Sequence, residues 1–365
     1  MKITAAVTRE KSGPFIVEEI ELEEPRDNEV LVKVVGVGVC HTDLACRDQY
    51  FPVPLPSVFG HEGSGIVEKV GKKVAKVKPG DPVVMSILNC GECVPCKQGK
   101  VGYCLNVYGA NFSGGRLDGS TTMKKGSEVI HGSFFGQSSF ATYALAEERN
   151  VVKVREDAPL EKLGPLGCGV QTGAGGVMVA LHPNPGSSIA IFGMGSVGLS
   201  AVLGAVVCGC TKIIGIDVNP DRLKFSKELG ATHVVNPKEV DSVKAIQEIT
   251  GGGANYTLEC TGIPQVFRQA VDALCITGTC GLIGVSPLGT EVSLDMNGIL
   301  FGRTVRGIME GDAIPDIFIP QMVELYMQGR FPFDKLIQFY SFNDINKAVE
   351  DSEKGIVLKP VLRLS

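Results

Sequence analysis

The chain has 365 residues, of which 35 are basic and 40 are acidic, and its formal net charge is −5. This length is sufficient for two domains, and a hydrophobic content of 44% is enough to fill two cores. The chain has no basic surplus, only 6% aromatic residues and no tryptophan. These values argue against nucleic acid as a partner.

The N-terminal residues favour a cytoplasmic protein, because charged residues occur without the apolar stretch of a secretion signal. Residues 163–211 contain no Asp, Glu, Lys or Arg. Prolines and glycines interrupt every apolar run there before it reaches the roughly 20 residues that a membrane span needs. We therefore expect a buried strand and helix in this segment, and no membrane association.

The first part of the chain has the pattern of an antiparallel β domain, with short apolar runs separated by Gly and Pro about every ten residues. The expected strands are residues 15–22, 30–37, 64–70, 82–86 and 139–144. Residues 87–140 are rich in Cys, Gly and Ser, and are expected to be irregular.

From about residue 170, apolar strand patterns alternate with helical patterns, which predicts a doubly wound parallel sheet. The expected strands are residues 189–192, 213–217, 232–236, 256–259 and 279–285. The expected helices are residues 199–207, 221–229, 240–250 and 264–274. The C-terminal part should contain helices at 316–327 and 342–352 and a closing strand at 357–364.

A glycine motif, Gly193-Met-Gly-Ser-Val-Gly198, follows the apolar run 189–192 directly. Gly193 permits the tight turn, Gly195 lets the backbone approach a pyrophosphate, and Gly198 allows close packing of helix and strand. Asp217 ends the next expected strand, where a carboxylate accepts hydrogen bonds from the ribose of NAD and repels the 2′-phosphate of NADP. The motif predicts NAD binding; the alternative is a glycine-rich helix start in a domain that binds no nucleotide.

Four of the twelve cysteines lie close together in the irregular segment: Cys90, Cys93, Cys96 and Cys104. Disulfides are uncommon in a cytosolic chain of this size, so metal binding is the better explanation. Four thiolates at this spacing are typical of a closed tetrahedral zinc site. An iron–sulfur cluster uses the same ligands, although nothing else in the sequence indicates electron transfer.

A second group of potential metal ligands is dispersed along the chain: Cys40, His61 and Cys168. Together these side chains would form a Cys₂His zinc site with an open fourth position for water or substrate. Taken singly, each has another explanation: a buried thiol, a turn histidine, and a thiol packed beside glycines.

These motifs make the chain resemble the zinc-containing medium-chain alcohol dehydrogenases over essentially its full length. Gly60-His-Glu-Gly63 is a further motif of that family. The stretches Val39-Cys-His-Thr-Asp43, Gln137-Ser-Ser-Phe-Ala-Thr-Tyr143 and Gly164-Pro-Leu-Gly-Cys168 make the chain most similar to the bacterial aryl-alcohol (benzyl-alcohol) dehydrogenases. The resemblance implies a GroES-like β-barrel catalytic domain with both zinc sites (residues 1–169 and 310–365) and an NAD-binding Rossmann domain (170–309). It also implies two zinc ions per subunit, one catalytic and one structural.

The resemblance implies roles for the residues around the catalytic zinc. Cys40, His61 and Cys168 would bind the ion, and Glu62 would lie behind it and join or tune the coordination. Asp43 would orient His61. Thr42 would hydrogen-bond the alcohol oxygen and pass its proton to the cofactor ribose.

Cofactor contacts are implied in the same way. His41 would lie at the pyrophosphate, Arg222 beside the adenosine ribose, and Thr172 against the nicotinamide. Lys359 occupies a place where relatives carry a phosphate-binding arginine. Further contacts are expected at Ser196, Val197, Cys260, Ile283 and Val285.

One position departs from many relatives, which carry a histidine five residues after the first zinc cysteine to deliver the alcohol proton to solvent. Here that position is Ala45. The proton path beyond Thr42 and the ribose must therefore end in water or in another group.

The expected reaction is oxidation of a primary aromatic or allylic alcohol to an aldehyde, and the reverse, with hydride passing to NAD from a zinc-bound alkoxide in a cleft between the domains. Phe51, Ile87 and Phe112 are candidate apolar walls of the substrate pocket. Short aliphatic or terpenoid alcohols and polyols are alternative substrates.

Relatives are oligomers in which the sheets of the nucleotide-binding domains join edge to edge, so a tetramer is expected in preference to a dimer. Val285 and residues 291–294 are candidates for the edge strand.

Overall fold

A computed structural model describes residues 1–364. The chain forms two compact units. Unit 1 comprises Met1–Cys168, Ile314–Gly329 and the chain from Asp334 onward, and unit 2 comprises Gly169–Ala313 and Arg330–Phe333. The sequence predicts boundaries at 169/170 and 309/310. The structure adds a short return segment, Arg330–Phe333, to unit 2.

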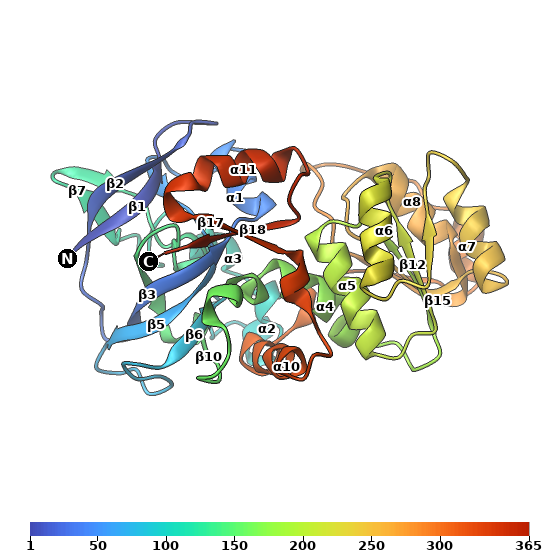
Figure 1. The fold of residues 1–365 in the computed structure, drawn as a ribbon, viewed down its shortest axis with the longest axis horizontal. Helices are drawn as coiled ribbons and strands as arrows, with labels where there is room; N and C mark the ends of the chain where they lie inside the picture. The colour runs from blue at the N-terminus through green and yellow to red at the C-terminus, as the bar shows by residue number, and fades with distance from the viewer. Residues whose placement is uncertain (365) are drawn as a thin grey trace. The chain divides into compact units, whose positions relative to one another are not determined.

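Unit 1 is built on two mainly antiparallel sheets (Figure 1). The first has the strand order β4-β1-β2-β7-β8. Its strands are β1 (Lys2–Thr8), β2 (Phe15–Leu22), β4 (Ser57–Val58), β7 (Met123–Lys125) and β8 (Glu128–Ile130). The second has the order β10-β6-β5-β3-β18-β17, with β9 paired to β3. Its strands are β3 (Glu29–Gly38), β5 (Glu62–Val70), β6 (Pro82–Met85), β9 (Tyr143–Glu147), β10 (Val151–Lys153), β17 (Ile337–Ser341) and β18 (Lys359–Arg363).

Unit 1 also contains helices. They are α1 (His41–Arg47), α2 (Val94–Lys97), α3 (Val107–Asn111), α10 (Pro315–Met327) and α11 (Ile345–Glu353). Helix α1 begins after Cys40, because the Asp43 carboxylate accepts a hydrogen bond from the Cys40 backbone N–H at 2.9 Å. The apolar faces of the strands form a core that includes Val30, Val32, Phe59, Phe134 and Phe140.

Unit 2 contains a parallel sheet with the strand order β13-β12-β11-β14-β15-β16. Its strands are β11 (Ser188–Phe192), β12 (Lys212–Ile216), β13 (His233–Val235), β14 (Ala254–Glu259), β15 (Leu274–Leu282) and β16 (Thr304–Gly307). Its helices are α4 (Gly169–Gly175), α5 (Ser196–Val207), α6 (Pro220–Glu228), α7 (Ser242–Thr250), α8 (Pro264–Asp272) and α9 (Met296–Leu300). Strand order reverses between β11 and β14, as in a doubly wound sheet.

Most predicted elements form within a few residues of the expected positions, but the strand expected at residues 139–144 does not. Strand β9 begins only at Tyr143, because the preceding backbone bonds to several neighbours in turn. Phe140 N–H donates to Phe59 O, and Thr142 N–H donates to Thr4 O. The segment therefore makes only an isolated bridge to β1, between Ala5 and Ala141, and no regular ladder forms.

Other differences concern short elements with weak sequence patterns. The segment expected to be irregular contains helices α2 and α3 and the β7–β8 hairpin. Strand β15 runs from Leu274 to Leu282 rather than from 279 to 285. Within the single chain, Val285 and residues 291–294 are not in strand, and their role as an edge strand between copies stays a prediction. The sheet ends at β13 on one side and at β16 on the other, and the sequence pattern does not indicate β16.

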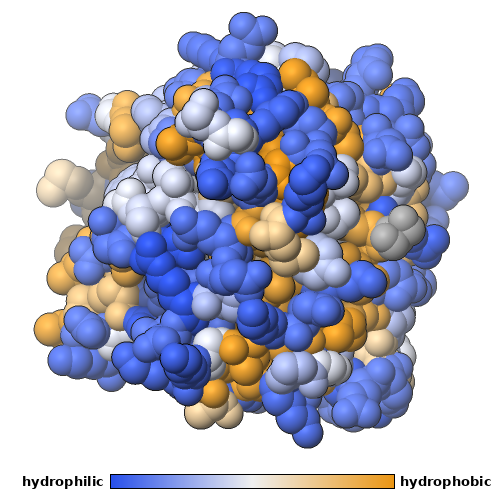
Figure 2. Space-filling model, turned by 90° about the vertical axis from the view of Figure 1, so that its left-hand side faces the viewer, coloured by the Kyte–Doolittle hydropathy of each residue, from blue (hydrophilic) through white to orange (hydrophobic). Residues whose placement is uncertain are grey.

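Ion pairs join side chains from several strands of the first sheet and from the residue that follows β1. Arg9 pairs with Glu18 and Glu128, and Lys125 pairs with Glu18. Figure 2 views this end of unit 1 and shows hydrophilic side chains over much of the face. Within residues 1–364, the helices are too short or too polar to cross a bilayer.

Candidate active site

Four potential metal ligands converge in unit 1: Cys40, His61, Glu62 and Cys168, whose ligand atoms all lie within 4.8 Å of one another. Strands β3 and β5 are antiparallel neighbours, and Gly38 at the end of β3 lies opposite Glu62 at the start of β5. The residues just after β3 therefore lie beside the start of β5. Cys168 follows the short turn Gly164–Gly167. The structure therefore brings together the dispersed group that the sequence predicts.

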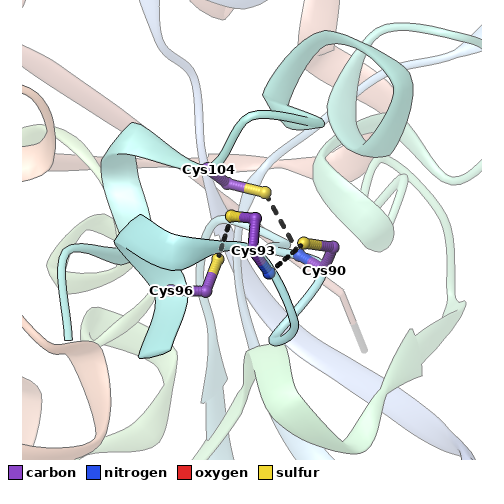
Figure 3. A group of neighbouring side chains, drawn as sticks. All are labelled: Cys90, Cys93, Cys96 and Cys104. Atoms are coloured by element: carbon purple, nitrogen blue, oxygen red, sulfur yellow. Dashed lines mark hydrogen bonds between the residues drawn. The ribbon is translucent and has the colours of Figure 1, made fainter. Parts of the chain in front are cut away.

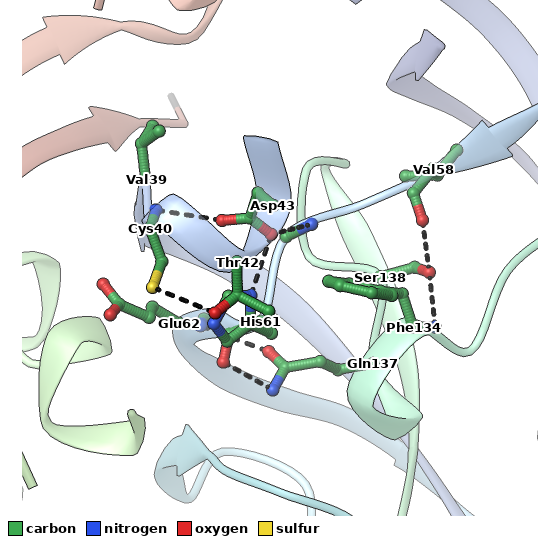
Figure 4. Close-up of polar contacts among 12 residues, drawn as sticks. Val39, Cys40, Thr42, Asp43, Val58, His61, Glu62, Phe134, Gln137 and Ser138 are labelled. Carbon is green, nitrogen blue, oxygen red and sulfur yellow. Dashed lines mark hydrogen bonds and ion pairs between the residues drawn. The ribbon is translucent and has the colours of Figure 1, made fainter. Parts of the chain in front are cut away.

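The His61 ring is held from one side and free on the other. Its Nδ1 lies 2.8 Å from Asp43 Oδ1, and both side chains are fully buried (Figure 4). Its Nε2 is buried without a hydrogen-bond partner among the described residues. A carboxylate at Nδ1 favours the tautomer that leaves the Nε2 lone pair available to a metal.

The two cysteines provide the sulfur atoms that such a site needs. A hydrogen bond with Cys168 lowers the pKa of Cys40 well below its usual range, against the opposing effect of burial. The hydroxyl of Thr42 lies beside this sulfur, with Oγ1 at 3.8 Å from Cys40 Sγ. Two thiolates, an imidazole nitrogen with no partner and a nearby carboxylate are a donor set that fits zinc.

Glu62 is tied to the C-terminal part of the chain. Both of its carboxylate oxygens lie 2.9 Å from Lys359 Nζ, which also donates to Val39 O at 3.3 Å. Burial alone would lower the pKa of Lys359, but the Glu62 carboxylate raises it overall, whereas burial raises the pKa of Glu62. The structure thus places Lys359 against Glu62, and its contact with a cofactor phosphate stays a prediction.

The loop 133–138, which the sequence does not mark, supports the backbone around His61. Gln137 Nε2 donates to His61 O at 2.9 Å, and Gln137 Oε1 accepts from Gly63 N–H at 3.2 Å (Figure 4). Ser133, Phe135 and Ser138 have positive φ values of 57°, 52° and 51°. This backbone is strained for non-glycine residues and is held by side-chain hydrogen bonds such as that from Phe134 N–H to Ser138 Oγ.

Aromatic rings extend away from His61. Phe135 stacks on the imidazole with ring centroids 4.4 Å apart. Phe112 lies 5.2 Å from Phe135 and 6.3 Å from Phe51. Phe51 and Phe112 are partly exposed, whereas Ile87 is 4% exposed and belongs to the buried core. Of the three predicted pocket residues, Phe51 and Phe112 therefore have exposed surface that a ligand could contact.

The second metal cluster consists of Cys90, Cys93, Cys96 and Cys104 (Figure 3). Their sulfurs also lie within 4.8 Å of one another. Backbone N–H groups point at them: Cys93 N–H donates to Cys90 Sγ at 3.4 Å, and Asn106 N–H donates to Cys104 Sγ at 3.4 Å. Hydrogen bonds from the Glu92 and Cys93 backbones lower the pKa of Cys90 to about 6. The cluster fits a structural zinc ion.

In unit 2, the glycine turn has the geometry that the motif predicts. Gly193 has φ of +94°, and a Cβ at Gly198 would lie 1.8 Å from Gly193 O. A Cβ at Gly195 would meet nothing within 4 Å, so this backbone is open to a ligand. Asp217 Oδ2 accepts from Met194 N–H at 2.6 Å, which holds the carboxylate beside the turn.

The other predicted cofactor residues lie at several places in the two units. In unit 2, Ser196 and Val197 open helix α5, Arg222 lies in the first turn of α6, and Thr172 lies in α4. Cys260, Ile283 and Val285 follow the ends of β14 and β15. In unit 1, His41 is exposed in the first turn of α1. Their contacts with a cofactor stay predictions.

Comparison with known families identifies two domains in the chain. Residues 26–156 match the alcohol dehydrogenase GroES-like domain, and residues 196–327 match the zinc-binding dehydrogenase family. Together with the parallel sheet of unit 2, these matches confirm the predicted combination of a GroES-like domain and a Rossmann domain.

Individual relatives are similar over almost the whole chain. A geraniol dehydrogenase from Castellaniella defragrans is 48% identical over 361 residues, 98% of this chain and 96% of the relative. The crystal structure of benzyl alcohol dehydrogenase from Acinetobacter calcoaceticus is 50% identical with a TM-score of 0.97, covering 100% of each chain. A zinc-binding dehydrogenase from Sinorhizobium meliloti, solved with bound NADP, is 25% identical with a TM-score of 0.83, covering 100% of each chain.

Proposed function

Because the chain belongs to the zinc-containing medium-chain alcohol dehydrogenases, we propose that it oxidises primary alcohols whose carbinol carbon is bonded to an aromatic ring or a double bond. Benzyl, cinnamyl and terpenoid alcohols such as geraniol share this chemistry. The aldehyde is reduced in the reverse direction. The proposal is consistent with the similarity to both a geraniol and a benzyl alcohol dehydrogenase.

The aromatic series beside His61 carries the proposal. Phe135 stacks on the ligand histidine, and the partly exposed rings of Phe112 and Phe51 continue outward from it. Phe134 supports Phe112 from the buried side, with centroids 5.9 Å apart. Flat substrates gain contact with such rings, typically about 0.5–1.5 kcal/mol per pair beyond the area that they bury. Ethanol gains neither term.

We propose that the catalytic metal is zinc bound by Cys40, His61 and Cys168, with a second zinc at the four-cysteine cluster. When bound, the catalytic ion supplies Lewis-acid polarisation of the substrate oxygen. Asp43 keeps the His61 ring in the ligand tautomer. Thr42 Oγ1, beside Cys40 Sγ, would accept the proton of the substrate hydroxyl and pass its own hydroxyl proton on to the cofactor ribose. Glu62, neutralised by Lys359, adds little net charge near the thiolates.

We propose NAD rather than NADP as the cofactor, because of Asp217. Its carboxylate is fixed at the carboxyl end of β12 by the N–H groups of Met194 and Asn219, at 2.6 and 2.8 Å. A fixed negative charge there accepts hydrogen bonds from ribose hydroxyls and repels a 2′-phosphate. The NADP-bound relative at 25% identity indicates that the wider fold also accommodates NADP.

The expected assembly is a homo-oligomer, with a tetramer favoured over a dimer. Strand β16 is an edge strand, and the preceding residues Leu300 and Phe301 are 78% and 61% exposed. Unpaired edges and exposed apolar side chains favour association with another copy.

We propose a small alcohol or aldehyde as the ligand, a cytoplasmic location, and no nucleic-acid or membrane partner.

A substrate panel tests the proposed function. Initial rates of NADH formation are measured with benzyl alcohol, cinnamyl alcohol, geraniol, ethanol and sorbitol. The proposal expects kcat/KM for the first three to exceed that for ethanol by at least about 100-fold, because each methylene-sized contact contributes roughly tenfold or more. Comparable values for ethanol, or a preference for sorbitol, would favour the alternative substrates.

A further inference from the structure

Glu259 lies at a strand end that faces the expected dinucleotide position. It is the last residue of β14 and pairs with Phe192, the last residue of β11, directly before Gly193. Strand order reverses between these two strands. In doubly wound sheets, ligands bind outside the carboxyl ends of the strands at this reversal. The sequence patterns gave Glu259 no role.

The Glu259 carboxylate is fully buried and organises the loop that follows it. Oε1 accepts from Thr261 N–H at 2.6 Å and from the Thr261 hydroxyl, and Oε2 accepts from Gly262 N–H at 3.0 Å. Within residues 1–364 it forms no ion pair with a basic side chain. Its charge is therefore stabilised by these N–H and O–H donors, whose bonds to an ionised group are strong.

The backbone of the same residue holds a second segment. Glu259 O accepts from Ile283 N–H at 2.9 Å and from Gly284 N–H at 3.0 Å, which ends the β15 ladder at Leu282. The two loops leave no space between them. A Cβ at Gly284 would lie 2.0 Å from Gly262 N and 2.5 Å from Glu259 Oε2.

The first loop also touches the glycine turn. A Cβ at Gly193 would lie 2.8 Å from Thr261 Cγ2. Because the two segments are this close, a shift of Thr261 would change the position of the turn that would bind the pyrophosphate. Glu259 thus connects three segments on this side of the sheet: the turn at 193, the loop 260–262 and the segment 283–285.

We propose that Glu259 is a positioning residue for cofactor binding. It sets the backbone of residues 260–262 and 283–285, and through Thr261 the turn at Gly193, in the arrangement that the dinucleotide requires, without itself touching the cofactor. The inference rests on the proposed use of a nicotinamide dinucleotide. A purely structural carboxylate would affect stability alone, so affinity for the cofactor distinguishes the two roles.

Isothermal titration of the purified, zinc-loaded protein with NADH tests this inference. The Glu259→Gln variant keeps the size of the side chain but turns an amide N–H₂ toward backbone N–H donors. We expect it to raise the Kd for NADH at least about tenfold, with the binding stoichiometry, the zinc content and the KM for alcohol at saturating NAD unchanged. Thr261→Val, which removes the hydroxyl that donates to Glu259 and accepts from Ile263 N–H, should raise the Kd by a smaller factor. Glu248→Gln, at an exposed position in α7, is the matched control.

The outcomes separate this inference from the proposed function. A Kd within about twofold of the wild-type value in both variants overturns the positioning role, even if their thermal stability falls. If Glu259→Gln does not fold, the Thr261→Val result decides. Wild-type protein is also titrated with NADPH. Binding of NADPH alone contradicts the NAD proposal, and the variants are then compared with NADPH; failure to bind either cofactor overturns both proposals.

Discussion

Asp43 Oδ1 lies 2.8 Å from His61 Nδ1, and neither side chain is exposed to solvent. The same carboxylate accepts from the backbone N–H of Cys40 at 2.9 Å and of Gly60 at 3.1 Å. One buried acid thus fixes the ring of a metal ligand and the backbone beside two ligands. Asp43 thus holds together the backbone and the imidazole of the proposed catalytic metal site.

Asp43→Asn should therefore weaken zinc binding at the catalytic cluster. An amide cannot accept all three hydrogen bonds as a carboxylate does, so we expect a loss of metal affinity of about 10–100-fold. Competition with a chelator measures it, and zinc at the four-cysteine cluster should be retained. Asp48→Asn, at the C-terminal end of the same helix, is the control and should bind zinc normally. Equal affinity in the two variants would contradict the role of Asp43.

The four-cysteine cluster should stabilise the fold without taking part in the reaction. Cys96→Ser removes one thiolate ligand, so the zinc content should fall from two ions to one per chain. The midpoint of thermal unfolding should fall by about 5 °C or more, as expected for a loss of 2–3 kcal/mol in a domain of this size. Elemental analysis and scanning calorimetry measure both quantities. Unchanged values for both would show that the cluster is not a metal site.

Asp217 should determine cofactor choice. Asp217→Ala removes the fixed charge, so the ratio of kcat/KM for NAD to that for NADP should fall at least about 100-fold. The loss of hydrogen bonds to the ribose lowers activity with NAD, and the loss of repulsion raises activity with NADP. Steady-state kinetics with both cofactors test this. A wild-type enzyme that uses NADP as well as NAD would already refute the assignment.

Phe112 should contribute to the preference for flat substrates. Phe112→Leu keeps an apolar side chain but removes the ring, so the benzyl-to-ethanol ratio of kcat/KM should fall by about tenfold. Phe15→Leu is the matched control, because Phe15 packs edge-on against Phe140 in the buried core of unit 1. Both variants should lose stability, but only the first should change selectivity. A similar change of selectivity in the control would mean that the effect is structural.

Asp81 should make the stability of unit 1 depend on pH. Burial raises its pKa, but hydrogen bonds from Lys153 Nζ and Lys78 N–H, at 2.7 and 3.0 Å, outweigh burial and lower the pKa overall. A lowered folded-state pKa contributes stability above the unfolded value of about 3.9, and this is lost as the pH falls through the folded value. Asp81→Asn should cost about 1 kcal/mol at pH 7 and progressively less as the pH falls below the unfolded-state pKa. Urea unfolding across pH 3–7 measures the difference; a constant difference would contradict it.

The sequence predicts the parts of the site that are encoded by short motifs. The glycine turn, the four-cysteine cluster and the stretch around Cys40 each place their chemistry within a few residues, so spacing alone is informative. The dispersed ligands Cys40, His61 and Cys168 required the family resemblance as well. The pairing of β3 with β5 brings Cys40 and His61 close together.

The supporting residues could not be predicted in the same way, because their contacts join distant parts of the chain. Gln137 bonds to His61 across 76 residues, and Lys359 pairs with Glu62 across 297. A buried glutamine or lysine leaves no periodic pattern in a sequence. The adjacent residues Phe134 and Phe135 are compatible with a functional aromatic cluster, but two neighbouring phenylalanines in a sequence are equally compatible with ordinary core packing.

Strand β16 illustrates the same limit for the fold. It has the residues Thr304-Val-Arg-Gly307, which show little alternation, and it forms because β15 offers a parallel partner. The β7–β8 hairpin likewise depends on pairing with β2. Longer apolar runs, such as β11 and β12, were predictable because burial on both faces leaves a continuous hydrophobic stretch.

The central claim is that an alcohol binds at the metal held by Cys40, His61 and Cys168. Cobalt(II) substituted at this cluster gives a direct measurement, because two thiolate ligands produce strong visible absorption bands that depend on the other ligands. We predict that these bands appear in the wild-type protein and in Cys96→Ser, are lost in Cys40→Ser, and shift when benzyl alcohol and NAD are added together. Bands that are absent, or that do not respond to the alcohol, would contradict the account.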